Sequence, residues 1–347
     1  MENNIVISFI IPAHNSEKFL KRCVESVVKE EKQPKDNNLA EVIIIENGSS
    51  DHTKQIGTAL AEKYENVFLI CSEKGVSNAR NAGVKAAHGE WIFFLDADDY
   101  LPAGTLQKLL DTVNSGKAAD LYIFSYEKGN AIVNVATGEN ADGYEGTGVR
   151  ECLAGMLRNP TRCMAVWGKL FRHSIIQQSS LDFNKKLSLA EDSDFLIRYI
   201  IKCGRIIFSQ ESCYHYSTDA GSAMRTYDGK KTEGYLLSLQ TTQNAIPENE
   251  LYQAYQVYIL MHLNIMMVRE VFSAGNRVAF SEKVKALKKI LREEIFQKAL
   301  QAVPVASCRS ARMMPILLLK FQQYYLCGKV YELRAKQNEK KEMRTED

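Results

Sequence analysis

Residues 91–101, WIFFLDADDYL, form an apolar run that ends in three carboxylates, Asp96, Asp98 and Asp99. The apolar part is short and rich in residues that favour β-structure, so it predicts a buried strand. Neighbouring carboxylates repel one another and are too costly to bury without a partner. Mg²⁺ or Mn²⁺, which prefer oxygen ligands, would supply the missing positive charge. The same residues also fit a solvated acidic turn before a helix, whose first turn favours Asp.

Three earlier apolar runs also end in polar residues. Residues 5–11, 42–45 and 67–71 are short, apolar and rich in β-branched side chains, which predicts three more strands. Apolar side chains recur at helical spacing within residues 19–28 and 56–64, so helices are expected between the strands. Strands that alternate with helices over short connections predict a parallel α/β sheet.

The polar residues after these strands should meet at one edge of the sheet. The carboxyl ends of parallel strands lie together, and ligands bind there, near a switch in strand order. The polar groups are Ala13-His14-Asn15, residues 46–51, residues 73–75 and Asp96 to Asp99. Their convergence predicts one functional site. A second acidic group opens a predicted helix at residues 187–203 and contains Glu191, Asp192 and Asp194.

The overall composition excludes several classes of protein. The chain has 347 residues, is 45% apolar and carries a net charge of +2, so it predicts a globular protein without a nucleic-acid partner. Its eight cysteines form no CxxC pair and indicate a reducing, cytoplasmic compartment. The N-terminal apolar run is too short for a signal peptide or a membrane span. The absence of GxGxxG and GxxxxGKS argues against a dinucleotide enzyme or a P-loop NTPase. No sequence feature indicates an oligomeric state.

The C-terminal third has a helical pattern without strand signals. Helices are predicted at residues 236–245, 251–272, 282–302 and 314–335. Residues 309–344 mix large apolar side chains with Lys and Arg, which is typical of a basic amphipathic helix on an anionic membrane. A helix docked on its own domain, followed by a solvated tail, explains the same pattern. Both interpretations remain open at this point.

Four motifs in a fixed order resemble the family-2 glycosyltransferases with the GT-A fold. They are FIIPAHN, VIIIENGSSD, GVSNARNAGVKAAHGEWIFFLDADDYL and LAEDSDF, and the resemblance covers residues 5–220. It implies a Rossmann-like, mixed and mostly parallel sheet flanked by helices. It also implies transfer of a sugar from a nucleotide diphosphate donor, with inversion and with a divalent metal. We expect a glycosyltransferase domain at 1–225, with a nucleotide-sugar half at 1–115 and an acceptor half at 116–225, and a helical region at 226–347.

The resemblance further implies which residues bind the donor. Pro12 and Ala13 would lie beside the nucleotide base, and Glu46 and Asn47 would help to read it. Glu46 keeps an acceptor for a uracil N–H, whereas Asn47 is neutral where the family commonly has an aspartate. The residues implied near the base, ribose and diphosphate are Lys74, Asn78 and Arg80.

The carboxylates after the fourth strand correspond to the DxD motif of the family, Asp96-Ala97-Asp98. Asp96 would face the ribose or the metal, and Asp98 would bind the metal. His215, in the segment CYHYS, would make a further contact to the metal or to a phosphate. The alternative for His215 is a half-buried residue with an ordinary hydrogen bond.

The resemblance places the acceptor side around Asp192. This carboxylate would remove the proton from the attacking hydroxyl, and Glu191 would contact the acceptor. Trp167 and Lys169 are expected to line the acceptor site, because aromatic faces suit sugar rings. The alternatives are a first-turn carboxylate that only stabilises its helix and a tryptophan that belongs to the core.

The sequence therefore predicts an inverting, metal-assisted transferase that uses a UDP-sugar or another nucleotide sugar. A saccharide or lipid-linked acceptor at the inner face of the cell membrane is expected. One alternative is a nucleotidyltransferase acting on sugar phosphates, which would carry a glycine-rich basic loop where this chain has residues 13–16, AHNS. Another is a non-catalytic partner subunit that keeps the fold.

Overall fold

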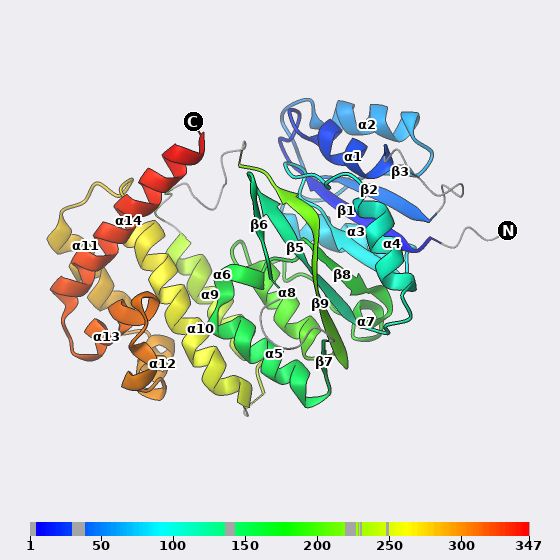
Figure 1. Cartoon of the computed structure of the whole chain (residues 1–347). Coiled ribbons are helices and arrows are strands. Elements are labelled where there is room, and N and C mark those ends of the chain that lie inside the picture. The colour runs from blue at the N-terminus through cyan, green and yellow to red at the C-terminus, as the bar shows by residue number, and fades with distance from the viewer. Residues whose placement is uncertain are drawn as a thin grey trace. The chain divides into compact units, whose positions relative to one another are not determined.

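The computed structural model (Figure 1) describes residues 5–29, 39–135, 143–218, 227, 229, 231–247 and 250–346, with side chains for all of these except 250 and 341–346. The chain forms two compact units. The first comprises Met1–Val149 and Met164–Ala220, and the second comprises Arg150–Cys163 and Gly221–Asp347. The predicted boundary at 225/226 lies outside the described residues. The segment at 150–163, which we expected in the N-terminal domain, belongs to the second unit.

The first unit is built on one mixed sheet with the strand order β3-β2-β1-β4-β8-β5-β9-β7, and β6 pairs with β5. The four predicted N-terminal strands are β1 (Ile7–Ala13), β2 (Ala40–Glu46), β3 (Val67–Cys71) and β4 (Trp91–Phe94). They pair in parallel, with β2 and β4 on opposite sides of β1. The direction of winding therefore reverses at β1, which is the place where such sheets bind ligands.

The rest of the sheet consists of β5 (Leu121–Lys128), β6 (Ala131–Val133), β7 (Tyr144–Glu145), β8 (Lys169–Arg172) and β9 (Arg205–Tyr216). β8 runs antiparallel to both β4 and β5, which confirms a mixed sheet. β9 is one continuous strand of 12 residues. Its pairing with β5 shifts register after Phe124, so a β-bulge carries the strand across its polar middle.

Helices flank the sheet in the first unit. They are α1 (Leu20–Val28), α2 (Thr53–Lys63), α3 (Val76–Ala86), α4 (Thr105–Asn114), α7 (His173–Gln178) and α8 (Glu191–Ile200). α3 lies against β1 and β2. The close approach depends on Gly83, because a Cβ there would lie 2.3 Å from Cγ2 of Ile10. This contact fixes the helix that carries Arg80.

The second unit is helical. Its α-helices are α5 (Thr147–Arg158), which begins in the first unit, α6 (Pro160–Cys163), α9 (Lys231–Gln243), α10 (Glu250–Met266), α11 (Phe280–Ile290), α12 (Glu294–Ala302), α13 (Met314–Lys320) and α14 (Tyr324–Glu346). A π-helix, Met267–Val271, continues α10, and the 3₁₀ turns Val305–Cys308 and Ala311–Met313 precede α13. The helix predicted at 314–335 is interrupted, because Gln322 adopts a left-handed backbone (φ 58°). No helix within the described ranges is long and apolar enough to cross a bilayer.

Candidate active site

The carboxyl ends of β1, β2 and β4 form a common edge. Ala13 is opposite Glu46 in the parallel pairing of β1 with β2. The Leu95 N–H donates to the Ile10 carbonyl oxygen over 3.0 Å, so Asp96 leaves β4 at the same edge. The convergence expected from the sequence is confirmed for Ala13, Glu46, Asn47 and Asp96, and Pro12 precedes Ala13 in β1.

A buried arginine joins this edge to the acidic group of α8. The Arg80 side chain is only 5% exposed. Its Nη1 donates to Asp192 Oδ1 over 2.5 Å and to Glu191 Oε1 over 3.0 Å, and its Nη2 donates to Asp96 Oδ1 over 3.3 Å. Three carboxylates from two distant segments therefore meet at one guanidinium. The Arg80 Nε has no hydrogen-bond partner among the residues described.

The position of Asp192 is fixed from both sides. Ala190, just before α8, has a left-handed backbone (φ 56°), which is unfavourable for a residue with a Cβ and has to be held by its surroundings. The second carboxylate oxygen of Asp192 accepts the Val166 N–H over 3.2 Å. With 20% of its side chain exposed, Asp192 keeps access to solvent. It is held in place and can still be reached by a substrate.

The cluster contains more negative than positive charge. Burial raises the pKa of Asp96 to about 6, although the neighbouring Arg80 favours its ionised form. Burial and the nearby Asp192 also raise the pKa of Glu191. The pKa of Arg80 is raised because its attraction to the three carboxylates outweighs its burial. One guanidinium does not neutralise this group, and a bound cation would stabilise it.

The donor set at Asp98 suits a hard divalent cation. Asp98 is half-buried, and its carboxylate has no hydrogen-bond or ion-pair partner in the part of the chain that the structure describes. Its neighbour Ala97 is buried and anchors the turn. Among the described side chains, no three His, Cys, Asp or Glu are grouped as a metal site. Asp96 and Asp98 could therefore hold Mg²⁺ or Mn²⁺ only together with substrate oxygens or water.

His215 reaches the same region from β9. Its backbone pairs with Tyr100, just after the Asp96 to Asp99 cluster, and the two rings stack 4.2 Å apart. Its Nδ1 lies 3.0 Å from Glu127 Oε2, which orients the ring. The predicted contact of His215 with metal or phosphate stays a prediction, and the other ring nitrogen would have to make it.

Asp99 has a structural role. It is 2% exposed, accepts the Tyr214 hydroxyl over 2.5 Å and accepts the Ser217 N–H over 2.7 Å. Burial raises its pKa to about 8. The Tyr214 hydroxyl also accepts the Asp96 N–H over 3.3 Å. Asp99 thus ties the turn after β4 to the end of β9.

The base-reading pair predicted at the end of β2 is engaged in local contacts. Glu46 Oε1 accepts the Ser49 N–H over 2.6 Å. Burial alone would raise the pKa of Glu46, but the hydrogen bonds that its carboxylate accepts outweigh burial and lower the pKa. The Asn47 amide donates to the Glu73 carbonyl oxygen over 2.6 Å and accepts the Gly75 N–H over 2.9 Å. Asn47 therefore braces the loop before α3. Its predicted base contact remains a prediction, which these contacts do not favour.

The next two donor-side candidates lie on that loop and on α3. Lys74 is exposed, and its carbonyl oxygen accepts the Asn78 side-chain N–H over 2.9 Å. The Asn78 Oδ1 has no hydrogen-bond partner among the described residues. Both residues follow β3 in the chain, and their contacts with a donor remain predictions.

The two acceptor-side candidates differ in their surroundings. Trp167 is half-buried and stacks on Tyr214 with ring centres 4.6 Å apart. Lys169 is 3% exposed, and its Nζ donates to the Ala165 carbonyl oxygen over 2.7 Å. The predicted acceptor contact of Lys169 is untested, but its burial makes it a brace for the loop that carries Trp167.

Sequence reasoning missed Arg22. Its Nη2 donates to the Asp98 carbonyl oxygen over 2.8 Å and to Ser217 Oγ over 3.0 Å. The guanidinium also lies 4.8 Å from the centre of the Tyr100 ring. Arg22 thus clamps the turn that presents the Asp98 carboxylate. No sequence signal marks it, because its partners are 76 and 195 residues away along the chain.

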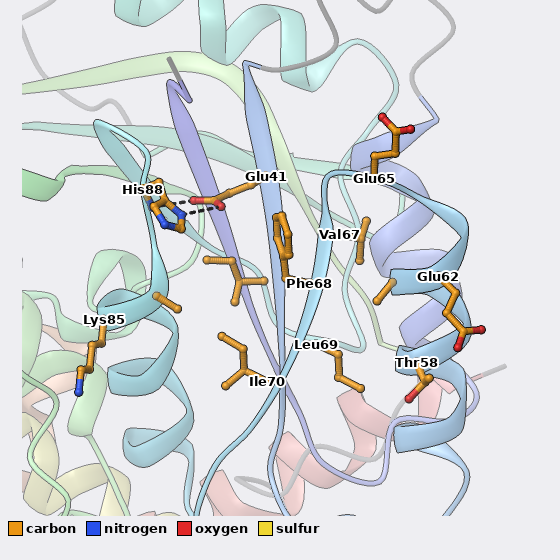
Figure 2. A pocket seen from close by; sticks show the side chains of 13 residues that line it. Glu41, Thr58, Glu62, Glu65, Val67, Phe68, Leu69, Ile70, Lys85 and His88 are labelled. Atoms are coloured by element: carbon orange, nitrogen blue, oxygen red, sulfur yellow. Dashed lines mark hydrogen bonds and ion pairs between the residues drawn. The ribbon is translucent and has the colours of Figure 1, made fainter. Parts of the chain in front are cut away.

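A pocket of about 810 Å³ lies elsewhere in the first unit, along the edge strand β3 (Figure 2). Glu41 and His88 pair at its rim, and Phe68 is 46% exposed there. None of the predicted site residues lines this pocket. Its volume alone therefore does not make it the active site.

Comparison with known proteins identifies the fold and the family. The model of "Glycosyl transferase family 2" matches residues 8–175. EpsH of Bacillus subtilis (strain 168), a protein assigned as a glycosyltransferase, is 27% identical over 329 residues, 91% of this chain and 92% of EpsH. The poly(ribitol-phosphate) beta-N-acetylglucosaminyltransferase TarS of Staphylococcus aureus (strain Mu50) is 24% identical over 89% of this chain and 52% of TarS.

A crystal structure of S. aureus TarS 1–349 in complex with UDP-GlcNAc aligns with a TM-score of 0.64 at 20% identity, over 96% of this chain and 92% of that chain. The similarity covers both compact units, and at 20% identity it shows a shared fold. Residues 8–175 thus match glycosyl transferase family 2, and the chain that carries them is a glycosyltransferase with the GT-A fold.

Proposed function

We propose that this glycosyltransferase moves a sugar, with inversion, from a UDP-sugar to a hydroxyl group of a saccharide or of a lipid-linked saccharide. The observation that carries the proposal is the meeting of Asp96, Glu191 and Asp192 at Arg80. Asp96 belongs to the sheet edge of the parallel strands, and the other two belong to α8. The donor and acceptor would therefore meet beside Arg80.

Asp192 is the proposed general base. Its carboxylate is partly exposed, whereas Asp194 in the same helical turn is 1% exposed and paired with Arg198 over 2.7 Å. A carboxylate within about 3 Å of the acceptor hydroxyl can take its proton as the oxygen attacks. Attack opposite the leaving diphosphate inverts the anomeric carbon. No covalent intermediate is needed, so neither Ser nor Cys has to act as a nucleophile.

Asp98 and Asp96 are the residues that would hold a divalent cation, with His215 as a further candidate. When bound, such a cation neutralises the charge that develops on a diphosphate leaving group. The excess of carboxylates around Arg80 and the free Asp98 carboxylate support this assignment. Arg22 would keep Asp98 oriented through its backbone carbonyl.

The donor would lie along the edge formed by β1, β2 and the start of α3. We assign the base to the region of Pro12, Ala13 and Glu46, and the ribose and diphosphate to that of Lys74, Asn78 and Asp96. Asn47 would act indirectly, by bracing the loop that carries Lys74. The choice of uridine is supported by the TarS complex, which contains UDP-GlcNAc.

The acceptor would enter between Asp192 and Trp167. Glu191 would bind or orient it, and the aromatic face of Trp167 suits a sugar ring. The names of the relatives refer to poly(ribitol-phosphate) in TarS and to succinoglycan biosynthesis in ExoO of Rhizobium meliloti (strain 1021). They support a cell-envelope polymer as the acceptor class.

The deciding experiment is incubation of the full chain with single UDP-sugars, Mn²⁺ and a panel of saccharide acceptors. Acceptor-dependent release of UDP, with a product of inverted anomeric configuration by NMR, is expected. Release of pyrophosphate from UTP and a sugar phosphate would instead favour a nucleotidyltransferase. Absence of both activities, with no donor binding by calorimetry, would overturn the proposal.

A further inference from the structure

Helix α14 exposes an apolar and basic face that its own unit covers only in part, where Tyr325 and Lys329 contact Phe280. Tyr325, Leu326 and Leu333 are 62%, 53% and 57% exposed. At about 100° per residue, these positions and three lysines fall within one arc of about 100° around the helix. The lysines are Lys329, Lys336 and Lys340, all exposed. We call these six residues the α14 face.

The opposite side of α14 explains why the helix is docked. Cys327 and Tyr331 are 0% exposed and Ala335 is 6% exposed. The Tyr331 hydroxyl donates to Asn264 Oδ1 over 2.7 Å, which ties α14 to α10. Of the two interpretations of residues 309–344, the helix docked on its own domain is therefore correct for this side of α14. By helical spacing the α14 face lies opposite these contacts. Tyr325 and Lys329 touch the Phe280 ring as well, yet both side chains stay exposed.

Exposed apolar side chains concentrate here. Of the ten large hydrophobic side chains exposed within the described part of the chain, five lie between residues 314 and 333. The five are Met314, Phe321, Tyr325, Leu326 and Leu333. Single exposed apolar residues are ordinary, but a contiguous group indicates a binding surface. Phe321 lies shortly before α14 in the chain.

The same segment has a strong positive charge. Residues 309–340 contain seven Lys or Arg and two Glu, whereas the whole chain has a net charge of only +2. The two acids, Glu332 and Glu339, fall outside the arc of the α14 face. Lys329 pairs with Glu332 over 3.2 Å and lies 3.9 Å from the centre of the Phe280 ring, so its position is fixed in part. The surface is complementary to an anionic partner.

We propose that the α14 face binds the surface of an anionic lipid bilayer. The helix would lie parallel to the membrane plane, with Tyr325, Leu326 and Leu333 entering the boundary between headgroups and acyl chains. Lysine side chains have long apolar stems, so Lys329, Lys336 and Lys340 can reach back to lipid phosphates.

A bilayer is a better occupant than a folded protein partner. From Tyr325 to Lys340 the face runs for about 22 Å along one helix. Its polar groups are cations on flexible side chains, and it offers no Asn, Gln, Ser or Thr among its six members. Protein interfaces favour arginine and are depleted in lysine. Helices that bind in the membrane interface combine apolar side chains with lysine or arginine, and the α14 face contains both.

The inference goes beyond the proposed sugar transfer and does not depend on it. Co-sedimentation of the full chain with vesicles tests it, comparing phosphatidylglycerol/phosphatidylcholine vesicles with pure phosphatidylcholine vesicles. We expect binding to the anionic vesicles that weakens at 0.5 M salt, and little binding to the neutral ones. Equal binding to both kinds of vesicle, or none to either, would overturn the proposal.

Two triple variants separate the apolar from the charged contribution. Tyr325→Ser/Leu326→Ser/Leu333→Ser and Lys329→Gln/Lys336→Gln/Lys340→Gln should each lower the vesicle partition coefficient by about tenfold or more. The control is Phe68→Ser/Ile132→Ser, which removes two exposed apolar side chains from the first unit and should leave vesicle binding unchanged. Wild-type binding by both α14 variants would contradict the proposal.

Two further measurements keep the result unambiguous. Light scattering of the wild type and of the serine variant tests whether a second copy of the chain covers the α14 face instead. A dimer that dissociates in the variant would overturn the lipid assignment. Release of UDP with a soluble acceptor should be the same in wild type and variants. Failure of the sugar transfer with vesicle binding intact would count against the proposed function alone.

Discussion

Arg80 holds one positive charge between three carboxylates, and its burial makes that arrangement costly to disturb. The side chain is 5% exposed, while Asp96, Glu191 and Asp192 are 14–32% exposed at their side chains. Each of these carboxylates depends on the Arg80 guanidinium for an ion pair. This residue therefore links the two halves of the site whatever is bound there.

Replacing Arg80 with Met should lower the free energy of unfolding by about 3–5 kcal/mol, because it leaves buried carboxylates without their counter-charge. Arg80→Lys should cause an intermediate loss of stability, since one ammonium group cannot donate to the three carboxylates in the same geometry. Urea unfolding measures both. The control is Arg205→Met, whose pair with Glu145 is partly exposed and should cost at most about 1 kcal/mol. Equal losses for Arg80 and Arg205 would show that the cluster is not a buried network.

Asp192→Asn should reduce the rate of sugar transfer by about 10²–10⁴-fold, since the amide cannot take the acceptor proton. Donor binding should persist, because the proposed donor site lies on the strand edge. Single-turnover kinetics and calorimetry with UDP-sugar measure the two effects. Asp194→Asn is the matched variant in the same helical turn: it should lose stability through Arg198 and keep the transfer rate. An active Asp192→Asn enzyme would remove this residue from the catalytic role.

At the scale of elements, the contact of α3 with β1 decides where Arg80 stands. Gly83 lies one turn after Arg80, and a Cβ at Gly83 would meet Ile10. Glycine usually weakens a helix by up to about 1 kcal/mol relative to alanine. Here the close packing overrides that preference, and the helix is held near the strand.

Gly83→Ala should therefore destabilise the protein by about 1–3 kcal/mol through overpacking. The transfer rate should fall as well, because a displaced α3 moves Arg80. Gly155→Ala is the control, since Gly155 lies on α5 with no heavy atom within 4 Å of a Cβ, and it should stabilise by up to about 1 kcal/mol. Chemical denaturation of both variants decides the matter, and a stabilised Gly83→Ala protein would contradict the structure at this contact.

The helix α10 contains a histidine whose burial makes stability depend on pH. His262 is 6% exposed, and burial lowers its pKa to about 4, against the weaker effect of its contact with the Tyr258 carbonyl. The unfolded chain binds this proton near pH 6.5. Between pH 6.5 and 4 the unfolded state is therefore protonated at His262 while the folded state is not, and stability falls as the pH falls.

The loss due to His262 should approach about 3 kcal/mol at pH 4. His262→Gln should remove that part of the pH dependence between pH 6.5 and 4, as measured by urea unfolding at a series of pH values. His52→Gln, at a side chain that is 78% exposed, should leave the dependence nearly unchanged. Parallel pH profiles for the wild type and His262→Gln would show that the histidine is not buried in solution.

At the scale of the whole molecule, the binding of donor and cation should stabilise the chain as one event. A ligand at 100 times its dissociation constant adds about 2.7 kcal/mol, which raises the melting temperature by a few degrees. We expect this shift with UDP and Mn²⁺ together and a smaller one with UDP alone. Asp98→Asn should remove the Mn²⁺ increment and keep the UDP-only shift. A full Mn²⁺ increment in Asp98→Asn would exclude Asp98 as the metal ligand.

The division of the chain into two compact units is a property of the whole molecule. The sequence pattern predicts one change, from α/β to helical, and places it near residue 225. The structure instead assigns Arg150–Cys163 to the helical unit, so the chain enters that unit twice. A local pattern does not reveal which unit a helix packs with, because an amphipathic helix has the same periodicity against any partner.

The sequence by itself determined the parallel half of the sheet, because β1 and β4 are almost entirely buried and consist mainly of apolar residues. It also determined that Asp96 and Asp98 leave the sheet at the ligand-binding edge, since polar residues directly follow each strand. Only the tertiary structure decided what those side chains meet. Arg80 and Asp192 are 112 residues apart, and Arg22 and Ser217 are 195 apart. Contacts at such separations depend on how the elements pack, and no local pattern records them.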